Sequence, residues 1–218
     1  MKKNNLFTYR ANKYFTTREH PESLKGEIKI VDPKMYPDFI KFVLDCRKNI
    51  NTLYKLIITL ELTLGARVSE ILNLTKDNII FKNGNYFARI KVLKKKKKDK
   101  KPKIEWRISP IHPLTVPLLT DWLKSLRSDE KLFNLNRSTV YRKYKHLFDI
   151  HPHCLRHSMI TYLIEIQGWS MQRIVKHFHF SEVKTALCYF NYDGLEESKQ
   201  LIDMWDEKED TPLPLLNT

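Results

Sequence analysis

Helical spacing of apolar residues marks the first ordered part of the chain. Residues 32–49 place their apolar side chains on one face at intervals of three and four, which predicts an amphipathic helix. Residues 52–75 are richer in apolar positions and contain one glycine, Gly65, so we expect a mostly buried helix, a brief break and a second helix. Residues 1–30 are polar and mixed without clear periodicity, and we interpret them as an N-terminal arm or linker.

The period then changes to the alternation that is typical of β-strands. Strand-like segments lie at residues 77–81, 86–93 and 103–111. The first two are separated by the Asn83-Gly84 step, which is a strong signal for a tight hairpin turn. Three consecutive strands of this kind predict a small three-stranded antiparallel sheet.

The pattern is helical again from Pro113 to about Leu201, with weak breaks along the way. The fold class that we predict is therefore α+β and mainly helical, with one small sheet. We expect a single domain over residues 31–205 and a C-terminal tail over residues 206–218.

Charge points to the class of partner. The chain has 39 Lys and Arg against 25 Asp and Glu, a formal net charge of +14, and eight of the lysines fall within residues 94–103, between the second and third predicted strands. A lysine-rich surface kept for solubility is one explanation. Lysines crowded at a hairpin tip repel one another unless an anion neutralises them, so we favour contact with a nucleic-acid backbone.

Other features exclude several classes of protein. The three cysteines are far apart with no CxxC pair, which excludes a disulfide framework or a zinc module and favours a reducing, intracellular setting. No apolar run approaches the length of a membrane span, so we expect no membrane partner.

Arg67 follows the glycine break and begins the next predicted helix. An arginine at this place can direct its planar guanidinium at a phosphate beside the helix N-terminus. Glu70, three residues later, could cap the helix or brace the arginine. A surface salt bridge is the plainer alternative for this pair.

The stretch HPHCLRHS, residues 151–158, holds the second candidate group. His153 and Arg156 are three residues apart at a predicted helix start, so both side chains would project to one side, whereas we expect the adjacent His157 to point elsewhere. With Arg67 they could surround a phosphate. A metal site would have to gather scattered histidines without an HExxH motif or a CxxC partner. Those histidines are His151, His153, His157, His177 and His179.

The order of these motifs resembles the tyrosine recombinases of the phage integrase family. TLGARVSEILNL is similar to the family's first arginine motif, HCLRHSMITYLIE to its HxxR motif, and SEVKTALCYFNY to the segment that carries its nucleophilic tyrosine. The resemblance spans roughly residues 32–192 and implies the family's catalytic fold. The lysine-rich composition and short tail look closest to integrases of archaeal viruses or plasmids.

The resemblance also implies roles. Arg67 and Arg156 would clamp the scissile phosphate, His153 would donate a hydrogen bond to it, Lys95 would protonate the leaving 5′ oxygen, and Tyr189 would be the nucleophile. The expected activity is cleavage and rejoining of duplex DNA through a 3′-phosphotyrosyl intermediate, with no metal or other cofactor.

The remaining implied features concern the DNA complex. The family assembles a tetrameric synapse on DNA, so we expect self-association there, in the cytoplasm with the nucleoid or in a host cell. The lysines beside Lys95 would contact DNA, and Lys94 or Lys96 could replace it as the acid. These DNA-contacting lysines are Lys94, Lys96, Lys97 and Lys98.

The chain departs from the family's pattern in three ways. A Gly-His pair normally precedes the tyrosine by nine residues, but here Phe180 occupies the histidine position. We expect His179 to substitute after a one-residue shift, and aromatic packing at this position is the alternative. Tyr192, one helical turn after Tyr189, is a rival nucleophile. The segment before Asp32 is too short for the family's N-terminal clamping domain, so we expect an isolated catalytic domain or a minimal member with weaker DNA affinity.

Two other functions stay open on the sequence alone. A non-catalytic nucleic-acid-binding module would keep the basic hairpin and helices without chemistry at the tyrosine. A metal-dependent nuclease would use the histidine cluster and would form no covalent adduct.

Overall fold

Helices dominate the computed structural model, which describes residues 3–19, 27–92, 105–180, 186 and 189. The helices are α1 (Lys3–Asn12), α2 (Tyr36–Asp45), α3 (Thr52–Leu64), α4 (Val68–Ile71), α5 (Val116–Lys124), α6 (Arg137–Phe148), α7 (His153–Glu165) and α8 (Met171–Phe178). Short 3-10 turns are η1 (Pro33–Met35), η2 (Lys76–Asn78) and η3 (Pro113–Thr115). The strands are β1 (Phe15–Glu19), β2 (Glu27–Val31), β3 (Ile79–Lys82), β4 (Asn85–Val92) and β5 (Glu105–Pro110).

Helix α3 is the centre of the fold because it is apolar on nearly all of its faces. Every residue from Leu56 to Leu64 is buried. The Asn51 side chain caps its start by accepting a hydrogen bond from the Tyr54 amide at 3.0 Å. Gly65 ends the helix in the left-handed conformation, with φ of 54°.

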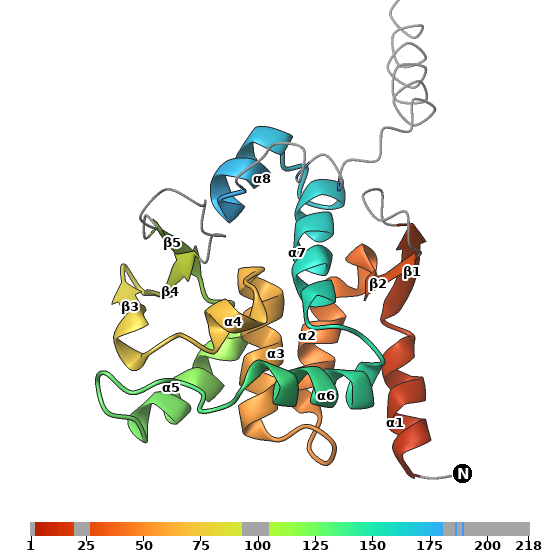
Figure 1. Cartoon of the computed structure of the whole chain (residues 1–218), viewed down its shortest axis with the longest axis horizontal. Coiled ribbons are helices and arrows are strands. Elements are labelled where there is room, and N and C mark those ends of the chain that lie inside the picture. Colours follow the sequence, from red (N-terminus) through yellow and green to blue (C-terminus); the bar gives the residue numbers. More distant parts are fainter. Residues whose placement is uncertain (1–2, 20–26, 93–104, 181–185, 187–188, 190–218) are drawn as a thin grey trace, which may run out of the picture.

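The predicted three-stranded antiparallel sheet is present, in the order β3-β4-β5. Its first turn has positive φ at both Asn83 (50°) and Gly84 (76°), which is the backbone that a two-residue hairpin of this type requires. Figure 1 shows this sheet on one side of α7 and the segment α1-β1-β2 on the other, with α6 crossing below and α8 above.

Helix α1 and strands β1 and β2 occupy the segment that the sequence pattern led us to interpret as an arm or linker. The Phe7 ring on α1 lies 5.6 Å from Phe42, and the Phe15 ring on β1 lies 5.1 Å from Phe39. The Val31 amide at the end of β2 donates to the Ser158 hydroxyl on α7 at 2.8 Å. These described residues therefore pack against the body of the fold.

Buried apolar residues form two clusters. The larger one extends through the helices from α1 to the start of α7. The smaller one joins α7 to α8 through Ile160, Leu163, Ile174 and Phe178, and Tyr189 packs against it. The second cluster therefore positions the described residues that come just before and at Tyr189.

Among the helices within residues 3–19, 27–92 and 105–180, none is long and apolar enough to cross a bilayer.

Candidate active site

Arg67 is held at the start of α4 by Glu70. The Glu70 carboxylate accepts from the Arg67 amide at 2.9 Å and from its Nη1 at 3.0 Å, so the glutamate both caps the helix and braces the arginine. The Glu70 side chain is only 2% exposed, whereas 39% of the Arg67 side chain is exposed. Glu70 therefore holds one guanidinium nitrogen, Nη1, while part of the Arg67 side chain stays open to solvent.

Arg156 approaches the same carboxylate from the first turn of α7. It is 1% exposed, its Nη1 donates to the Gly65 carbonyl at 2.6 Å, and the same nitrogen is 4.0 Å from Glu70. Burial, followed by the charge of Arg67, lowers the pKa of Arg156 to about 10. The two arginines, remote in sequence, thus meet at one carboxylate.

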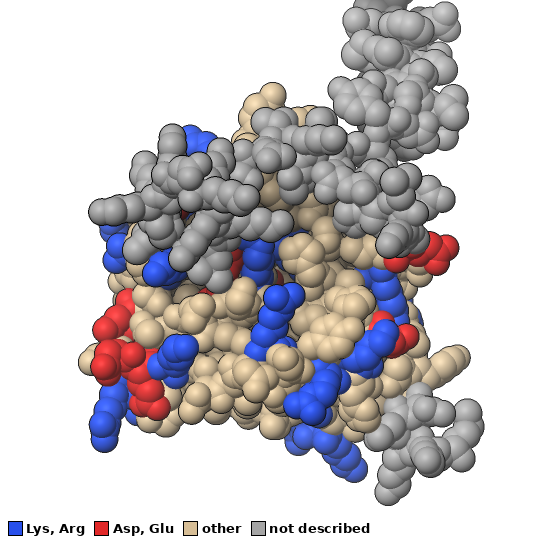
Figure 2. All heavy atoms as spheres, viewed as in Figure 1, with Lys and Arg blue, Asp and Glu red and all other residues tan. Residues whose placement is uncertain are grey.

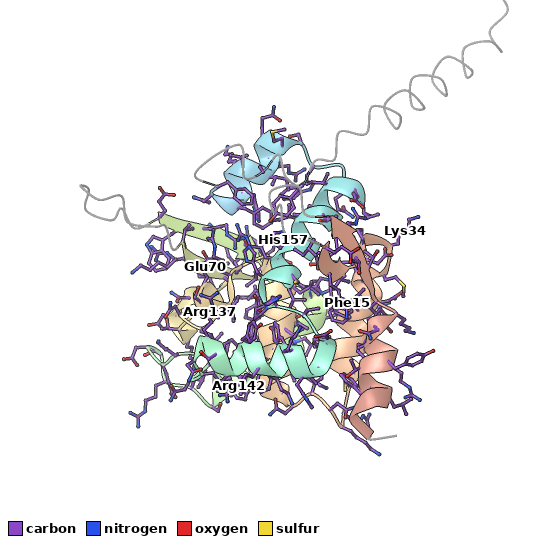
Figure 3. All side chains as sticks on the ribbon, turned by 45° about the vertical axis from the view of Figure 1, so that its right-hand side comes forward. Phe15, Lys34, Glu70, Arg137, Arg142 and His157 are labelled. Carbon is purple, nitrogen blue, oxygen red and sulfur yellow. The ribbon has the colours of Figure 1, made fainter. Side chains whose placement is uncertain are left out.

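A row of aromatic rings leads from α7 to Tyr189. The exposed His153 ring lies 4.6 Å from that of His157, edge to face, and the buried His157 ring lies 5.1 Å from that of Tyr189. The prediction that His157 points elsewhere is wrong, because residues four apart on a helix share a face. Figure 3 shows His157 and Glu70 in the region where α4, α7 and α8 meet.

His179 and Phe180, at the end of α8, occupy the positions of the family's Gly-His pair. His179 has a left-handed backbone, with φ of 50°, and its Nδ1 lies 3.2 Å from Glu105 on β5. The Phe180 ring lies 5.3 Å from the Arg156 guanidinium and 6.1 Å from the Tyr189 ring. Phe180 therefore borders the arginine and the tyrosine, while His179 pairs with a carboxylate on the sheet.

A third arginine, Arg107 on β5, was missed in the sequence. It is 3% exposed, and its Nη1 donates to the Leu64 carbonyl and to the Ser109 hydroxyl, each at 2.8 Å. Burial, then the charge of Arg156, lowers its pKa to about 9. The apolar residues that alternate with it, Trp106 and Ile108, would be expected on the inner face, but they are 39% and 59% exposed. The buried partners that reverse this alternation are visible only in the fold.

Several predicted site residues lie outside the part that the structure describes. They are the candidate acid Lys95, the neighbouring Lys94, Lys96, Lys97 and Lys98, and the rival nucleophile Tyr192.

Figure 2 shows Lys and Arg side chains near the middle of the drawn face, while Asp and Glu gather toward its edges.

The histidines do not converge as a metal site would require. Within the described ranges, no group of three or more His, Cys, Asp or Glu side chains could hold a metal ion. His151 packs on Tyr141, with ring centroids 5.2 Å apart, and His177 lies 3.4 Å from the Ser109 hydroxyl. Burial, then the charge of Arg107, lowers the pKa of His177 to about 4, so it is neutral at pH 7.

Comparison with known families identifies this arrangement. Residues 29–194 match the model of the phage integrase family. The chain belongs to this family. Its matched region includes Arg67, Arg156 and Tyr189, which confirms the family predicted from the motifs.

Two curated relatives of this phage integrase chain give the scale of similarity. It is 30% identical over 176 residues to the tyrosine recombinase XerA of Saccharolobus solfataricus, covering 78% of this chain and 54% of the relative. It is 26% identical over 184 residues to a probable integrase/recombinase of Acholeplasma phage L2, covering 78% of this chain and 62% of that protein. The chain therefore spans about half to three fifths of the length of these relatives.

Solved structures support the phage integrase fold. The XerH site-specific recombinase bound to a palindromic difH substrate matches with a TM-score of 0.62 at 19% identity, over 80% of this chain and 53% of that one. The Tn1549 transposon integrase in complex with transposon right end DNA matches with a TM-score of 0.59 at 15% identity, over 80% and 65%. These likenesses confirm the predicted fold class, a tyrosine-recombinase catalytic fold with a small three-stranded sheet.

Proposed function

We propose that this chain is the catalytic domain of a site-specific DNA recombinase or integrase that cleaves and rejoins duplex DNA through a 3′-phosphotyrosyl intermediate, without a metal ion. The observation that carries the proposal is the meeting of Arg67 and Arg156 at Glu70, beside a Phe180 ring that lies 5.3 Å from the Arg156 guanidinium and 6.1 Å from the Tyr189 ring. A single carboxylate cannot neutralise two guanidinium groups, so positive charge remains available to an anion.

The first role of the site is to stabilise charge on the scissile phosphate. Phosphoryl transfer depends mainly on positioning and on electrostatic stabilisation of the transition state. Arg67, which is partly exposed, would contact a non-bridging oxygen of the phosphate. The buried Arg156 would stabilise the negative charge of the phosphate from within the protein. His153, exposed at the start of α7, would donate a further hydrogen bond.

The second role is covalent catalysis. The Tyr189 oxygen would attack phosphorus and pass its proton to water, and the bond from phosphorus to the 5′ oxygen would break. Lys95 would give its proton to that oxygen, which leaves as a 5′ hydroxyl. Rejoining is the reverse step, in which a 5′ hydroxyl displaces Tyr189 and the phosphodiester bond energy is conserved.

The partner in this proposal is duplex DNA, bound in the cytoplasm of the cell. The Tn1549 transposon integrase, a structural neighbour, was solved in complex with transposon right end DNA, and the net charge of +14 suits a phosphate backbone. Lys94, Lys96, Lys97 and Lys98 would contact that backbone. We also propose that His179 supports the phosphate and that four copies of the chain assemble on two DNA sites.

A trapping experiment tests the proposal. A library of nicked duplexes with random sequence around the nick would be incubated with the parental chain and with Tyr189→Phe and Tyr192→Phe variants. Because of the nick, cleavage releases a short fragment that carries the 5′ hydroxyl and diffuses away, so the strand cannot be rejoined. The cleaved strand should therefore stay linked to protein on a denaturing gel. We expect adducts from the parental chain and from Tyr192→Phe, in EDTA as well as without it, and none from Tyr189→Phe.

The other outcomes favour the rival functions. Adducts from Tyr189→Phe but not from Tyr192→Phe would assign Tyr192 as the nucleophile. Cleavage that EDTA abolishes and that leaves no adduct would indicate the metal-dependent nuclease. Binding without any cleavage would indicate a non-catalytic DNA-binding module.

A further inference from the structure

The end of α3 is held by two buried arginines from different parts of the chain. The Leu64 carbonyl accepts from Arg107 at 2.8 Å, and the next carbonyl, that of Gly65, accepts from Arg156 at 2.6 Å. The last carbonyls of a helix lack partners within it and carry partial negative charge, so cations stabilise them. The two guanidinium groups therefore fix consecutive peptide units immediately before Arg67.

Arg107 is well placed to hold this turn still. Its strand, β5, is paired with β4 in a register that sets Arg107 opposite Ile90, and its Nη1 is also bound to the Ser109 hydroxyl. The side chain thus connects the backbone of the sheet to the backbone of α3. A shift of β5 would be transmitted to the turn that presents Arg67.

Phe178 closes the same junction from α8. Its ring lies 5.4 Å from the Arg107 guanidinium and 5.1 Å from that of Arg156. A Cβ atom on Gly65 would lie 2.5 Å from Phe178 Cε1, so the ring fills the space that only a glycine leaves. The ends of α3 and α8, the start of α7 and strand β5 therefore meet around Arg107 and Arg156.

The hydrogen bonds of Arg107 are made within the fold. The residue is 3% exposed, and its Nη1 makes two hydrogen bonds within the protein, to the Leu64 carbonyl and to the Ser109 hydroxyl. Its Nη2 is buried without a partner among the described atoms, and the nearby charges of Arg156 and Arg67 oppose its own. Burying such a cation is costly, and an apolar residue of similar volume would usually be tolerated better.

We infer that Arg107 is a positioning residue, which fixes the turn at Leu64 and Gly65 so that Arg67 and Arg156 face one phosphate. This inference rests on the proposed function, and it assigns to the proposed reaction a third arginine that touches neither the DNA nor the reacting atoms. Arg107 acts through the backbone of Leu64 and through its contact with Phe178.

The experiment compares Arg107→Met and Arg107→Lys with a matched control, Arg89→Met. Arg89 lies on the neighbouring strand, is exposed and stacks on Trp106 at 4.4 Å, so its replacement removes the same charge from the other face of the sheet. Three quantities are measured for each variant. They are the single-turnover rate of covalent adduct formation, the Kd for DNA, and the hydrogen exchange of amides 65–71 in the free protein.

Arg107→Met should lower the rate about 100-fold, since misplacing reacting groups by an ångström has an effect of this size. The Kd should stay within about threefold, because Arg107 does not contact DNA, and amides 65–71 should exchange about tenfold faster. Arg107→Lys, which keeps one donor for Leu64, should recover about tenfold of the lost rate. Arg89→Met should match the parental chain in rate and exchange.

Three results would overturn the inference: a rate for Arg107→Met within about threefold of the parental rate, a Kd that rises as much as the rate falls, or unchanged exchange. If Arg107→Met does not fold, Arg107→Lys decides, with a slower rate at unchanged Kd supporting the inference and a parental rate overturning it. If the parental chain forms no adduct, the proposed function fails, and the exchange measurement alone decides whether Arg107 positions the turn.

Discussion

Two of the places where the described residues bury ionisable side chains differ in how these side chains are paired. Between α3 and α6, the Tyr144 hydroxyl donates to Glu61 at 2.9 Å, and burial raises the pKa of Glu61 well above its usual range, which favours a neutral pair. At the end of α3, Arg67 and Arg156 meet at Glu70 and Arg107 lies close to Arg156, and burial, followed by the charge of a neighbouring arginine, lowers the pKa values of Arg107 and Arg156.

The comparison separates a structural polar pair from a charged site that is incomplete by itself. A buried neutral hydrogen bond adds modest stability and carries no net charge, although the other Glu61 oxygen, Oε1, is buried without a partner among the described atoms. Buried like charges destabilise the fold unless an anion approaches them. The arginine cluster is therefore the part of the core that a phosphate would stabilise, and the Glu61–Tyr144 pair is the part that it would not affect.

The largest expected effect is on catalysis by the arginine cluster. Arg156→Ala should lower the rate of adduct formation by about 10³-fold or more, because it removes charge stabilisation from the transition state. Single-turnover cleavage measures the loss, with the exposed Arg127→Ala as a control for charge. A rate near that of the parental chain would remove Arg156 from the site and with it the contrast between the two regions.

The next effect concerns the packing that holds the cluster. Gly65→Ala should lower the free energy of unfolding by about 2–4 kcal/mol, because its left-handed backbone and the contact with Phe178 both oppose a Cβ atom. Gly168→Ala is the control, since Gly168 has φ of 61° but a Cβ atom added there would meet no other described atom within 4 Å. Equal losses of the free energy of unfolding in both variants, measured by denaturant unfolding, would show that the Phe178 ring moves aside at little cost.

A smaller effect is expected at the structural pair. Tyr144→Phe should lower the free energy of unfolding by about 1–3 kcal/mol, because it leaves the buried Glu61 carboxyl without its donor. Cleavage at a temperature where the variant is folded should be unchanged. Tyr141→Phe, at a 38% exposed position on the same helix, is the control. A loss of cleavage without a loss of stability would mean that the two regions are coupled.

The last effect is the pH dependence of His177, which the partial exposure of its ring to solvent weakens. Its pKa is lowered to about 4 in the fold, so the unfolded chain takes up a proton before the folded one as the pH falls. The free energy of unfolding should therefore decrease from about pH 6.5 to about pH 4, and His177→Asn should flatten this slope. An identical slope in both proteins would show that His177 is more accessible than its contacts indicate.

Sequence patterns predicted most of the elements that carry the site. The Asn83-Gly84 turn, the Gly65 break and the helical spacing after Pro113 each depend on local backbone chemistry, which a sequence reveals directly. Helix α1 was missed although Phe7, Ala11 and Tyr14 have helical spacing, because polar residues surround them and their packing partners are distant in sequence.

The candidate site was predictable only where a motif carried it. Arg67 and Arg156 follow from recognisable motifs, and the i,i+4 spacing of His153 and His157 could have placed both rings on one face. Arg107 could not be predicted, because its burial depends on the Leu64 carbonyl, 43 residues away along the chain. Long-range contacts of this kind appear only when the chain is folded.

The most direct test of the central claim changes the charge of the DNA rather than that of the protein. A neutral methylphosphonate would replace the scissile phosphate, and the parental chain and Arg156→Ala would be compared on both substrates by single-turnover cleavage. If the arginines act by stabilising the negative charge of that phosphate, the loss caused by Arg156→Ala should shrink from about 10³-fold to about tenfold. An equal loss on both substrates would contradict the claim that Arg67 and Arg156 form a charge-stabilising phosphate site.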